Sequence, residues 1–140
     1  MNRNGPVIII EDDVDDQEIF LEAFTKLKYE NEIIFFFDGE AALSFLNNED
    51  VVPFLILSDI NLPKLDGLTI RKNLKTDAKL NIKCIPYLFV TNTTHQEAVM
   101  EAYSASAQGF FVKPNSITDF EKMIKLIMDY WMSCVAPKNI

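Results

Sequence analysis

Five polar residues stand where short hydrophobic runs of the sequence end: Glu11, Asp12, Asp59, Thr91 and Lys113. The runs before them are aliphatic or aromatic and are bounded by turn residues, a pattern typical of buried strands. A buried strand carries its last residues to the rim of the sheet, where open α/β sheets bind ligands. If the strands are parallel, all five side chains meet at one edge, and the sequence therefore predicts a polar site there.

Three of these residues are carboxylates, and like charges so close together resist full ionisation unless a cation offsets them. Magnesium fits, because it takes hard oxygen ligands and typically uses one or two carboxylates together with phosphate oxygens. Asp12 and Asp59 can ligate it directly, Glu11 through water, and a backbone carbonyl just past Asp59 can add another oxygen. Lys113 offers a point charge to an anion's oxygens, and Thr91 offers a hydroxyl donor. This set predicts phosphoryl transfer onto Asp59, giving an aspartyl phosphate.

The elements that must position these residues alternate along the chain. We predict strands over residues 7–10, 33–37, 54–58, 85–90 and 109–112. Helices are expected after Asp13 as N-cap, over 40–46, from Gly67 to about Thr76, after a capping box at Thr94-His95-Gln96-Glu97, and after Asn115 or Ser116. Five nearly continuous hydrophobic strands alternating with five helices predict an α/β fold: a doubly wound parallel sheet joined by right-handed crossovers.

Composition limits the class of protein. The 140 residues, 49% apolar and 24% charged, are enough for one ordinary core, so we expect a single domain over 1–140 with no effector domain. The net charge of −8 opposes binding to nucleic acid or to a membrane surface. The first hydrophobic run is too short for a signal peptide, so we expect a cytoplasmic protein. Cys84 and Cys134 form no CxxC pair and are expected to be reduced thiols.

Taken together, these motifs resemble those of response-regulator receiver domains of two-component signalling. The resemblance rests on Glu11-Asp12 after the first hydrophobic run, SDINLPKLDG around Asp59, Thr91 after LFV, and GFFVKP from Gly109 to Pro114. It covers nearly the whole chain and is strongest to stand-alone, chemotaxis-type regulators. The long final helix with its tryptophan is similar to that of stand-alone receivers working with bacterial phytochromes.

The resemblance implies that Asp59 accepts a phosphoryl group from a histidine kinase or a phosphotransfer protein. It also implies that Asp12, Asp59 and the backbone carbonyl of Asn61 bind Mg²⁺, with Glu11 assisting. Lys113 is expected to contact the phosphoryl group and to precede a cis peptide bond to Pro114.

The same resemblance implies a flavodoxin-like strand order, 2-1-3-4-5, and a conformational switch. Thr91 is expected to move toward the phosphoryl oxygens while Phe110, the switch aromatic, rotates inward. Phosphorylation would shift the population between two existing arrangements. The output would pass by protein contacts to a downstream protein. Such a protein is not a turnover enzyme, because it catalyses only its own phosphorylation and dephosphorylation.

The same residues allow other interpretations. Taken singly, Asp12 can be a helix cap, Lys113 a surface lysine and Thr91 a strand end. Two other functions are a phosphorylation-independent binding module, favoured by Asn92 after Thr91, and an aspartate-nucleophile phosphatase of the haloacid dehalogenase type. The phosphatase motif DxD is absent, because Asp59 is followed by Ile60-Asn61. A flavodoxin is a more distant alternative, since the first loop is acidic.

The single histidine and the last helix also allow more than one interpretation. His95, the only histidine, is interpreted as part of a solvated helix start rather than as a phosphate relay. The last helix carries more apolar residues than one buried face requires, which indicates either a homodimer or partner contact or a wider core. Its core stripe is Phe120, Ile124, Ile127 and Trp131, and the additional residues are Met123, Leu126, Met128, Tyr130 and Met132.

Overall fold

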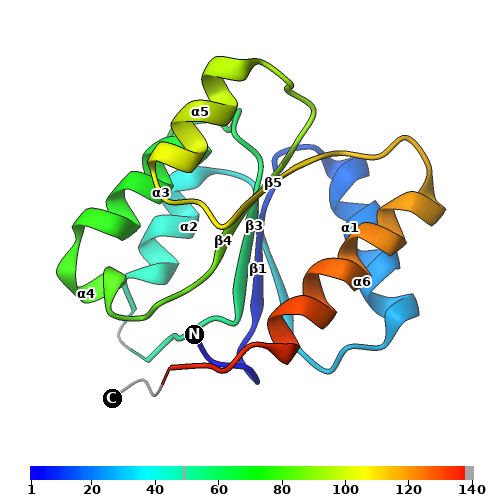
Figure 1. The fold of residues 1–140 in the computed structure, drawn as a ribbon, viewed down its shortest axis with the longest axis horizontal. Coiled ribbons are helices and arrows are strands. Elements are labelled where there is room, and N and C mark those ends of the chain that lie inside the picture. Colours follow the sequence, from blue (N-terminus) through cyan, green and yellow to red (C-terminus); the bar gives the residue numbers. More distant parts are fainter. Residues whose placement is uncertain (49, 138–140) are drawn as a thin grey trace.

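The fold is a parallel sheet between two layers of helices (Figure 1). The computed structural model describes residues 1–48 and 50–137. The strands are β1 (Val7–Ile10), β2 (Ile33–Phe36), β3 (Leu55–Ser58), β4 (Tyr87–Thr91) and β5 (Gly109–Val112). The helices are α1 (Val14–Leu27), α2 (Gly39–Leu46), α3 (Gly67–Thr76), α4 (Ala78–Asn81), α5 (Gln96–Ser104) and α6 (Ile117–Ser133).

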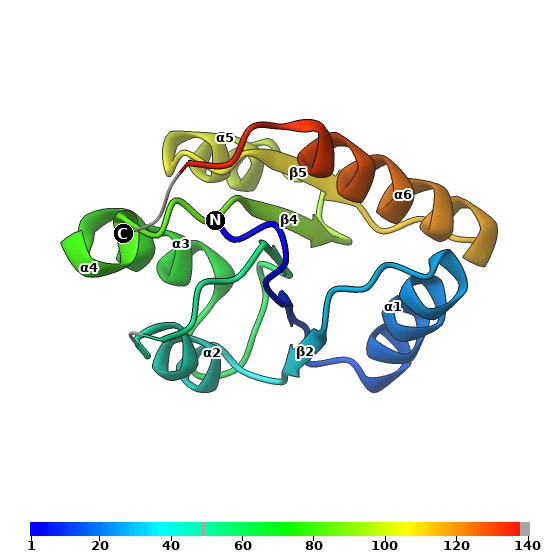
Figure 2. The same cartoon turned by 90° about the horizontal axis from the view of Figure 1, so that it is seen from below.

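The strand order is β2-β1-β3-β4-β5, and every neighbouring pair is parallel. This confirms the doubly wound order 2-1-3-4-5 expected from the sequence. Helices α1 and α6 cover one face, and α2, α3, α4 and α5 cover the other, as the view from below also shows (Figure 2). The central strands β1, β3 and β4 are buried along their whole length, which explains their nearly uninterrupted hydrophobic sequences.

The sheet separates two hydrophobic cores. Val7 and Ile9 of β1 face the core under α1 and α6, whereas Ile8 and Ile10 face the core under the other helices. All four side chains have no exposed surface. The two cores hold the sheet between its helix layers and so fix where the strand ends lie.

Several helix boundaries follow from local capping. Asp13 begins α1 by accepting a hydrogen bond from the backbone N–H of Asp16, and Ser116 begins α6 by accepting one from Asp119. The expected capping box at Thr94 is wrong. α5 begins after His95, whose side chain makes no capping bond, and Thr93 Oγ1 instead accepts from the His95 backbone N–H at 3.4 Å. His95 itself is exposed, as expected.

Within residues 1–48 and 50–137 the structure has six helices where five were predicted, and the additional one is α4. Asp77 caps it by accepting from the backbone N–H groups of Lys79 and Leu80, and Leu80 is buried in the core. A single four-residue turn shows no helical periodicity in sequence, and the burial of Leu80 depends on the tertiary fold. Strand β4 begins at Tyr87 rather than residue 85, and β2 ends at Phe36 rather than residue 37.

The peptide bond between Lys113 and Pro114 is trans, so the cis bond expected from the resemblance is wrong. The trans isomer of such a bond is favoured by about 0.5–1 kcal/mol in the absence of other constraints. Cys84 and Cys134 are free thiols, as predicted.

The structure shows which of the additional apolar residues of α6 are buried in the core and which are exposed. Met123 and Met128 are buried in the core, which favours the wider core contact for these two residues. Leu126 and Tyr130 remain 62% and 61% exposed on the outer face. Self-association through this face stays a prediction.

Candidate functional site

The register of the sheet brings the predicted residues to one edge. Ile10 of β1 pairs with Ser58 of β3, so the next residues, Glu11 and Asp59, lie side by side. The Asp59 backbone N–H donates to the Ile10 carbonyl at 3.0 Å and continues the ladder by one step. On the other side, Thr91 of β4 pairs with Val112 of β5, and Lys113 follows directly.

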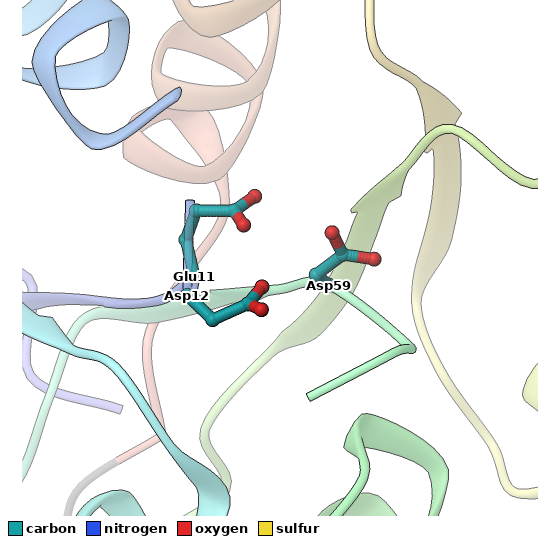
Figure 3. A group of neighbouring side chains, drawn as sticks. All are labelled: Glu11, Asp12 and Asp59. Carbon is teal, nitrogen blue, oxygen red and sulfur yellow. The ribbon is translucent and has the colours of Figure 1, made fainter. Parts of the chain in front are cut away.

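Glu11, Asp12 and Asp59 form an acidic cluster at this edge. Each offers one carboxylate oxygen, and the three oxygens lie within 4.8 Å of one another. Figure 3 shows the side chains of Glu11 and Asp12 extending from the end of β1 toward Asp59. Glu11 is 1% exposed and Asp59 is 9% exposed, whereas Asp12 is open to solvent. Hard oxygen donors at this spacing, with one open side, fit a divalent cation that keeps water ligands.

Lys113 reaches into the cluster and meets three carboxylates. Its Nζ lies 2.9 Å from Asp59 Oδ2, 2.8 Å from Asp16 Oδ2 and 2.5 Å from Glu11 Oε1. Contacts to Asp16 and Asp59 are hydrogen bonds, while the approach to Glu11 is an ion pair outside hydrogen-bond geometry. Burial opposes the charged ammonium, but the contacts with the Asp16, Glu11 and Asp59 carboxylates outweigh it and raise the pKa of Lys113 above its ordinary value.

Glu11 is the most strongly buried member of the cluster. Burial raises the pKa of Glu11 to about 7, although Lys113 and the backbone N–H of Asp13 act in the opposite direction. The Asp13 N–H donates to Glu11 Oε2 at 3.1 Å. A carboxylate so deep in the protein is stable as an anion only beside a cation, which is the environment that Lys113 and a metal ion both provide.

The carboxylate of Asp59 is held from two sides. Thr91 Oγ1 donates to Asp59 Oδ1 at 2.6 Å, and the backbone N–H of Ile60 donates to the same oxygen at 2.7 Å. Lys113 occupies the other oxygen. The sequence-predicted trio of Asp59, Thr91 and Lys113 therefore meets in direct contact.

A tight loop joins Asp59 to α3. The Gly67 backbone N–H donates to the Ile60 carbonyl at 2.8 Å. A Cβ at position 67 would lie 2.1 Å from the carbonyl oxygen of Asp59 and 2.9 Å from Ser58 Oγ. Glycine at this position is what lets α3 begin against the backbone of Asp59.

Two other predicted site residues, Asn61 and Phe110, lie in positions that do not test their predicted roles. Asn61 is exposed in the loop just after Asp59, and the role of its carbonyl as a metal ligand stays a prediction. Phe110 is half-buried in β5, with its ring centroid 6.1 Å from that of Phe89. Its expected rotation also stays a prediction.

Sequence reasoning missed Asp16 as a site residue. Its position in the first turn of α1 indicated a solvent-facing carboxylate, yet the structure brings it onto Lys113. The available signal was the N-cap at Asp13, which starts the helix directly beside the strand ends. Gln17 was missed for the same reason, and its Nε2 donates to the Glu11 carbonyl at 2.6 Å.

Known proteins share both the sequence pattern and the fold. The family model described as the response regulator receiver domain matches residues 7–125. The response regulator Rcp1 of Synechocystis is 28% identical over 134 residues, covering 92% of this chain and 90% of that protein. The probable methanogenesis regulatory protein FilR2 of Methanothrix harundinacea is 28% identical over 130 residues, covering 90% of this chain and 83% of that protein.

Solved structures of response regulators have the same fold as this chain. The Mn²⁺-bound form of Rcp1 matches with a TM-score of 0.80 at 29% identity, covering 95% of this chain and 99% of that one. The phosphorylated cyanobacterial phytochrome response regulator RcpA has the same fold, with a TM-score of 0.85 at 24% identity over 95% of this chain and 98% of that one. The expected likeness to phytochrome-associated stand-alone receivers is thus confirmed.

Within the described residues, none of the helices is both long enough and apolar enough to cross a membrane.

Proposed function

Because this chain belongs to the family of response regulator receiver domains of two-component signalling, we propose that it is a phosphorylation-activated switch whose phosphoacceptor is Asp59. The observation that carries the proposal is the direct contact of Asp59 with Thr91 and Lys113 at the edge of the acidic cluster. The Asp59 carboxylate is the nucleophile, Thr91 is the hydroxyl donor and Lys113 is the buried cation. Phosphoryl transfer requires this set of groups.

The proposed step is attack of an Asp59 carboxylate oxygen on the phosphorus of a phosphohistidine. The new bond joins that oxygen to phosphorus, the P–N bond breaks, and its electron pair leaves with the imidazole. Lys113 would stabilise the negative charge on the transferred phosphoryl oxygens, and the Thr91 hydroxyl would donate a hydrogen bond to one of them. The Ile60 backbone N–H, which donates to Asp59 Oδ1, would fix the rotation of the Asp59 side chain.

Mg²⁺ is the proposed cofactor. Asp12, Asp59 and the backbone carbonyl of Asn61 would hold it, with Glu11 assisting, and it would supply positive charge to the phosphoryl oxygens. The oxygen-only donor set and the solvent-open side at Asp12 support this choice. The Mn²⁺-bound structure of the similar protein Rcp1 supports a divalent ion at such a site.

The proposed partners are a histidine kinase or phosphotransfer protein as donor and a downstream protein as receiver of the signal, all in the cytoplasm. Thr91 and Phe110 would carry the change, since Thr91 at the end of β4 donates to Asp59 and Phe110 lies on the neighbouring strand β5, with its ring 6.1 Å from that of Phe89. The protein would not turn over a substrate; its catalysis would be limited to its own phosphorylation and dephosphorylation.

The test is intact mass after incubation with Mg²⁺ and a small acyl-phosphate donor. The wild type should gain one labile phosphoryl group, Asp59→Asn should gain none, and Lys113→Ala should gain it more slowly. A folded, metal-binding wild type that gains no phosphoryl group would refute the proposal and favour a phosphorylation-independent binding module. Sustained release of phosphate from a phosphate ester would instead favour a phosphatase.

A further inference from the structure

Asp16 is the partner of Lys113 that stands apart from the acidic cluster. It comes from α1, whereas Glu11 and Asp59 come from the strand ends and are members of the metal-ligand cluster. Its Oδ2 accepts a hydrogen bond from Lys113 Nζ at 2.8 Å. The side chain of Lys113 is 6% exposed and that of Asp16 is 23% exposed. Most of this contact is therefore shielded from water, and a charge-assisted hydrogen bond is strongest in such a shielded place.

The position of Asp16 matters for the electrostatics of Lys113 when a metal ion is bound. A divalent cation among Glu11, Asp12 and Asp59 would draw on two of the three carboxylates that Lys113 contacts. The same cation would repel the ammonium group at short range. With only these partners, Lys113 would swing away from Asp59 when the site fills. Asp16 offers a full negative charge that the metal site does not require.

We propose that Asp16 is a positioning residue that keeps the Lys113 ammonium beside Asp59 while the metal site is filled. The inference rests on the proposed phosphoryl transfer and deepens it, because it adds a residue that acts through Lys113 rather than on the phosphoryl group. Lys113 has three N–H donors, so it can keep one bond to Asp16 and present the other two to phosphoryl oxygens.

The local backbone fixes Asp16 for this purpose. Its N–H donates to the N-cap carboxylate of Asp13 at 3.1 Å, which sets the first turn of α1 beside the end of β1. Asp15, the preceding residue, carries the same charge in the same helical turn but is exposed, so it serves as a matched control.

The experiment compares wild type, Asp16→Asn, Asp16→Glu and Asp15→Asn. The rate of phosphorylation by a small acyl phosphate is measured at saturating Mg²⁺, and the Mg²⁺ dissociation constant is measured separately by calorimetry. Loss of one partly buried charge-assisted bond predicts a rate about tenfold lower for Asp16→Asn. Asp16→Glu should recover to within about threefold of wild type, and Asp15→Asn should stay within about twofold.

Metal binding separates positioning from collapse of the site. In Asp16→Asn, Lys113 is free to move away from the metal site, so its ammonium does not repel Mg²⁺ more than in wild type. Mg²⁺ should therefore bind Asp16→Asn no more than about threefold more weakly than wild type. Parallel loss of Mg²⁺ binding and rate would overturn the inference, since it would indicate a structural role. Equal slowing by Asp15→Asn, failure of Asp16→Glu to recover, or an unchanged rate in Asp16→Asn would overturn it as well. If the wild type itself gains no phosphoryl group, the proposed function fails and takes this inference with it; the other outcomes leave the function standing.

Discussion

Lys83→Met should destabilise the protein without affecting its phosphorylation chemistry. The Lys83 side chain is buried, and its ammonium donates to the carbonyls of Leu46, Asn48 and Val51, each at 2.8 Å. These carbonyls lie at the end of α2 and in the segment that leads to β3, so one ammonium group ties the two together. Methionine keeps the length of the side chain and removes its charge and donors.

The magnitude is worked from these three hydrogen bonds. A hydrogen bond to a charged group contributes about 1.5–3 kcal/mol, and a buried acceptor left without a partner costs about 1–3 kcal/mol. The Leu46 bond is buried, whereas the Asn48 and Val51 carbonyls are partly exposed and can recruit water. Removing the ammonium also removes its own desolvation cost. We expect a net loss of about 2–3 kcal/mol in the free energy of unfolding.

Urea denaturation followed by circular dichroism measures this loss. With a slope of about 2 kcal/mol per molar urea, the midpoint should fall by about 1–1.5 M. Lys75→Met is the control, because Lys75 is exposed in the last turn of α3. The phosphorylation rate of Lys83→Met should equal that of wild type, since Lys83 precedes β4 and Asp59 follows β3 at the opposite edge. A loss below about 1 kcal/mol would refute the reasoning that these three bonds stabilise the fold.

Three further outcomes are expected. Gly67→Ala should lower the free energy of unfolding by about 1–3 kcal/mol and weaken Mg²⁺ binding, because its Cβ would meet the Asp59 carbonyl at 2.1 Å; unchanged denaturation and calorimetry would contradict this. Mg²⁺ at about 100 times its dissociation constant should stabilise the wild type by about 2.7 kcal/mol, with a smaller gain in Asp12→Asn, as measured by thermal unfolding; equal gains would exclude Asp12 as a ligand. Burial and the hydrogen bond to Asp129 raise the pKa of Tyr29, so the folded state holds the phenol proton more tightly and gains stability that is lost as pH rises above about 10. Tyr29→Phe should make this alkaline loss shallower in urea titrations at successive pH values, and an unchanged slope would contradict it.

The sequence predicted the strands and the acidic edge because both depend on local signals. The runs at Val7–Ile10 and Gly109–Val112 have the predicted bounds, and the caps at Asp13 and Ser116 are confirmed. Once the sheet is parallel, residues that follow the strands must share an edge. The meeting of Asp59 with Lys113 needed no further information.

The features that the sequence did not predict depend on tertiary packing. Helix α4 exists because Leu80 packs in the core, and α5 begins at Gln96 with His95 as its N-cap although Thr94 has the better capping side chain. Asp16 joins the site because of the rotational phase at which α1 leaves β1. A shift of one residue in that helix start would have turned this carboxylate to solvent, and sequence spacing does not determine the phase so finely.

The pairing of Ile10 with Ser58 implies that this protein should respond differently to substitutions and to insertions or deletions. The site depends on how many residues separate each strand end from its neighbours, so apolar exchanges within β1 or β3 should be tolerated if volume is kept. One residue added to or removed from β3 would turn Asp59 to the other face of the sheet. Libraries of single-residue insertions should therefore lose the chemistry in these strands much more sharply than substitution libraries do, and evolutionary change in length should be confined to the loops at the opposite edge.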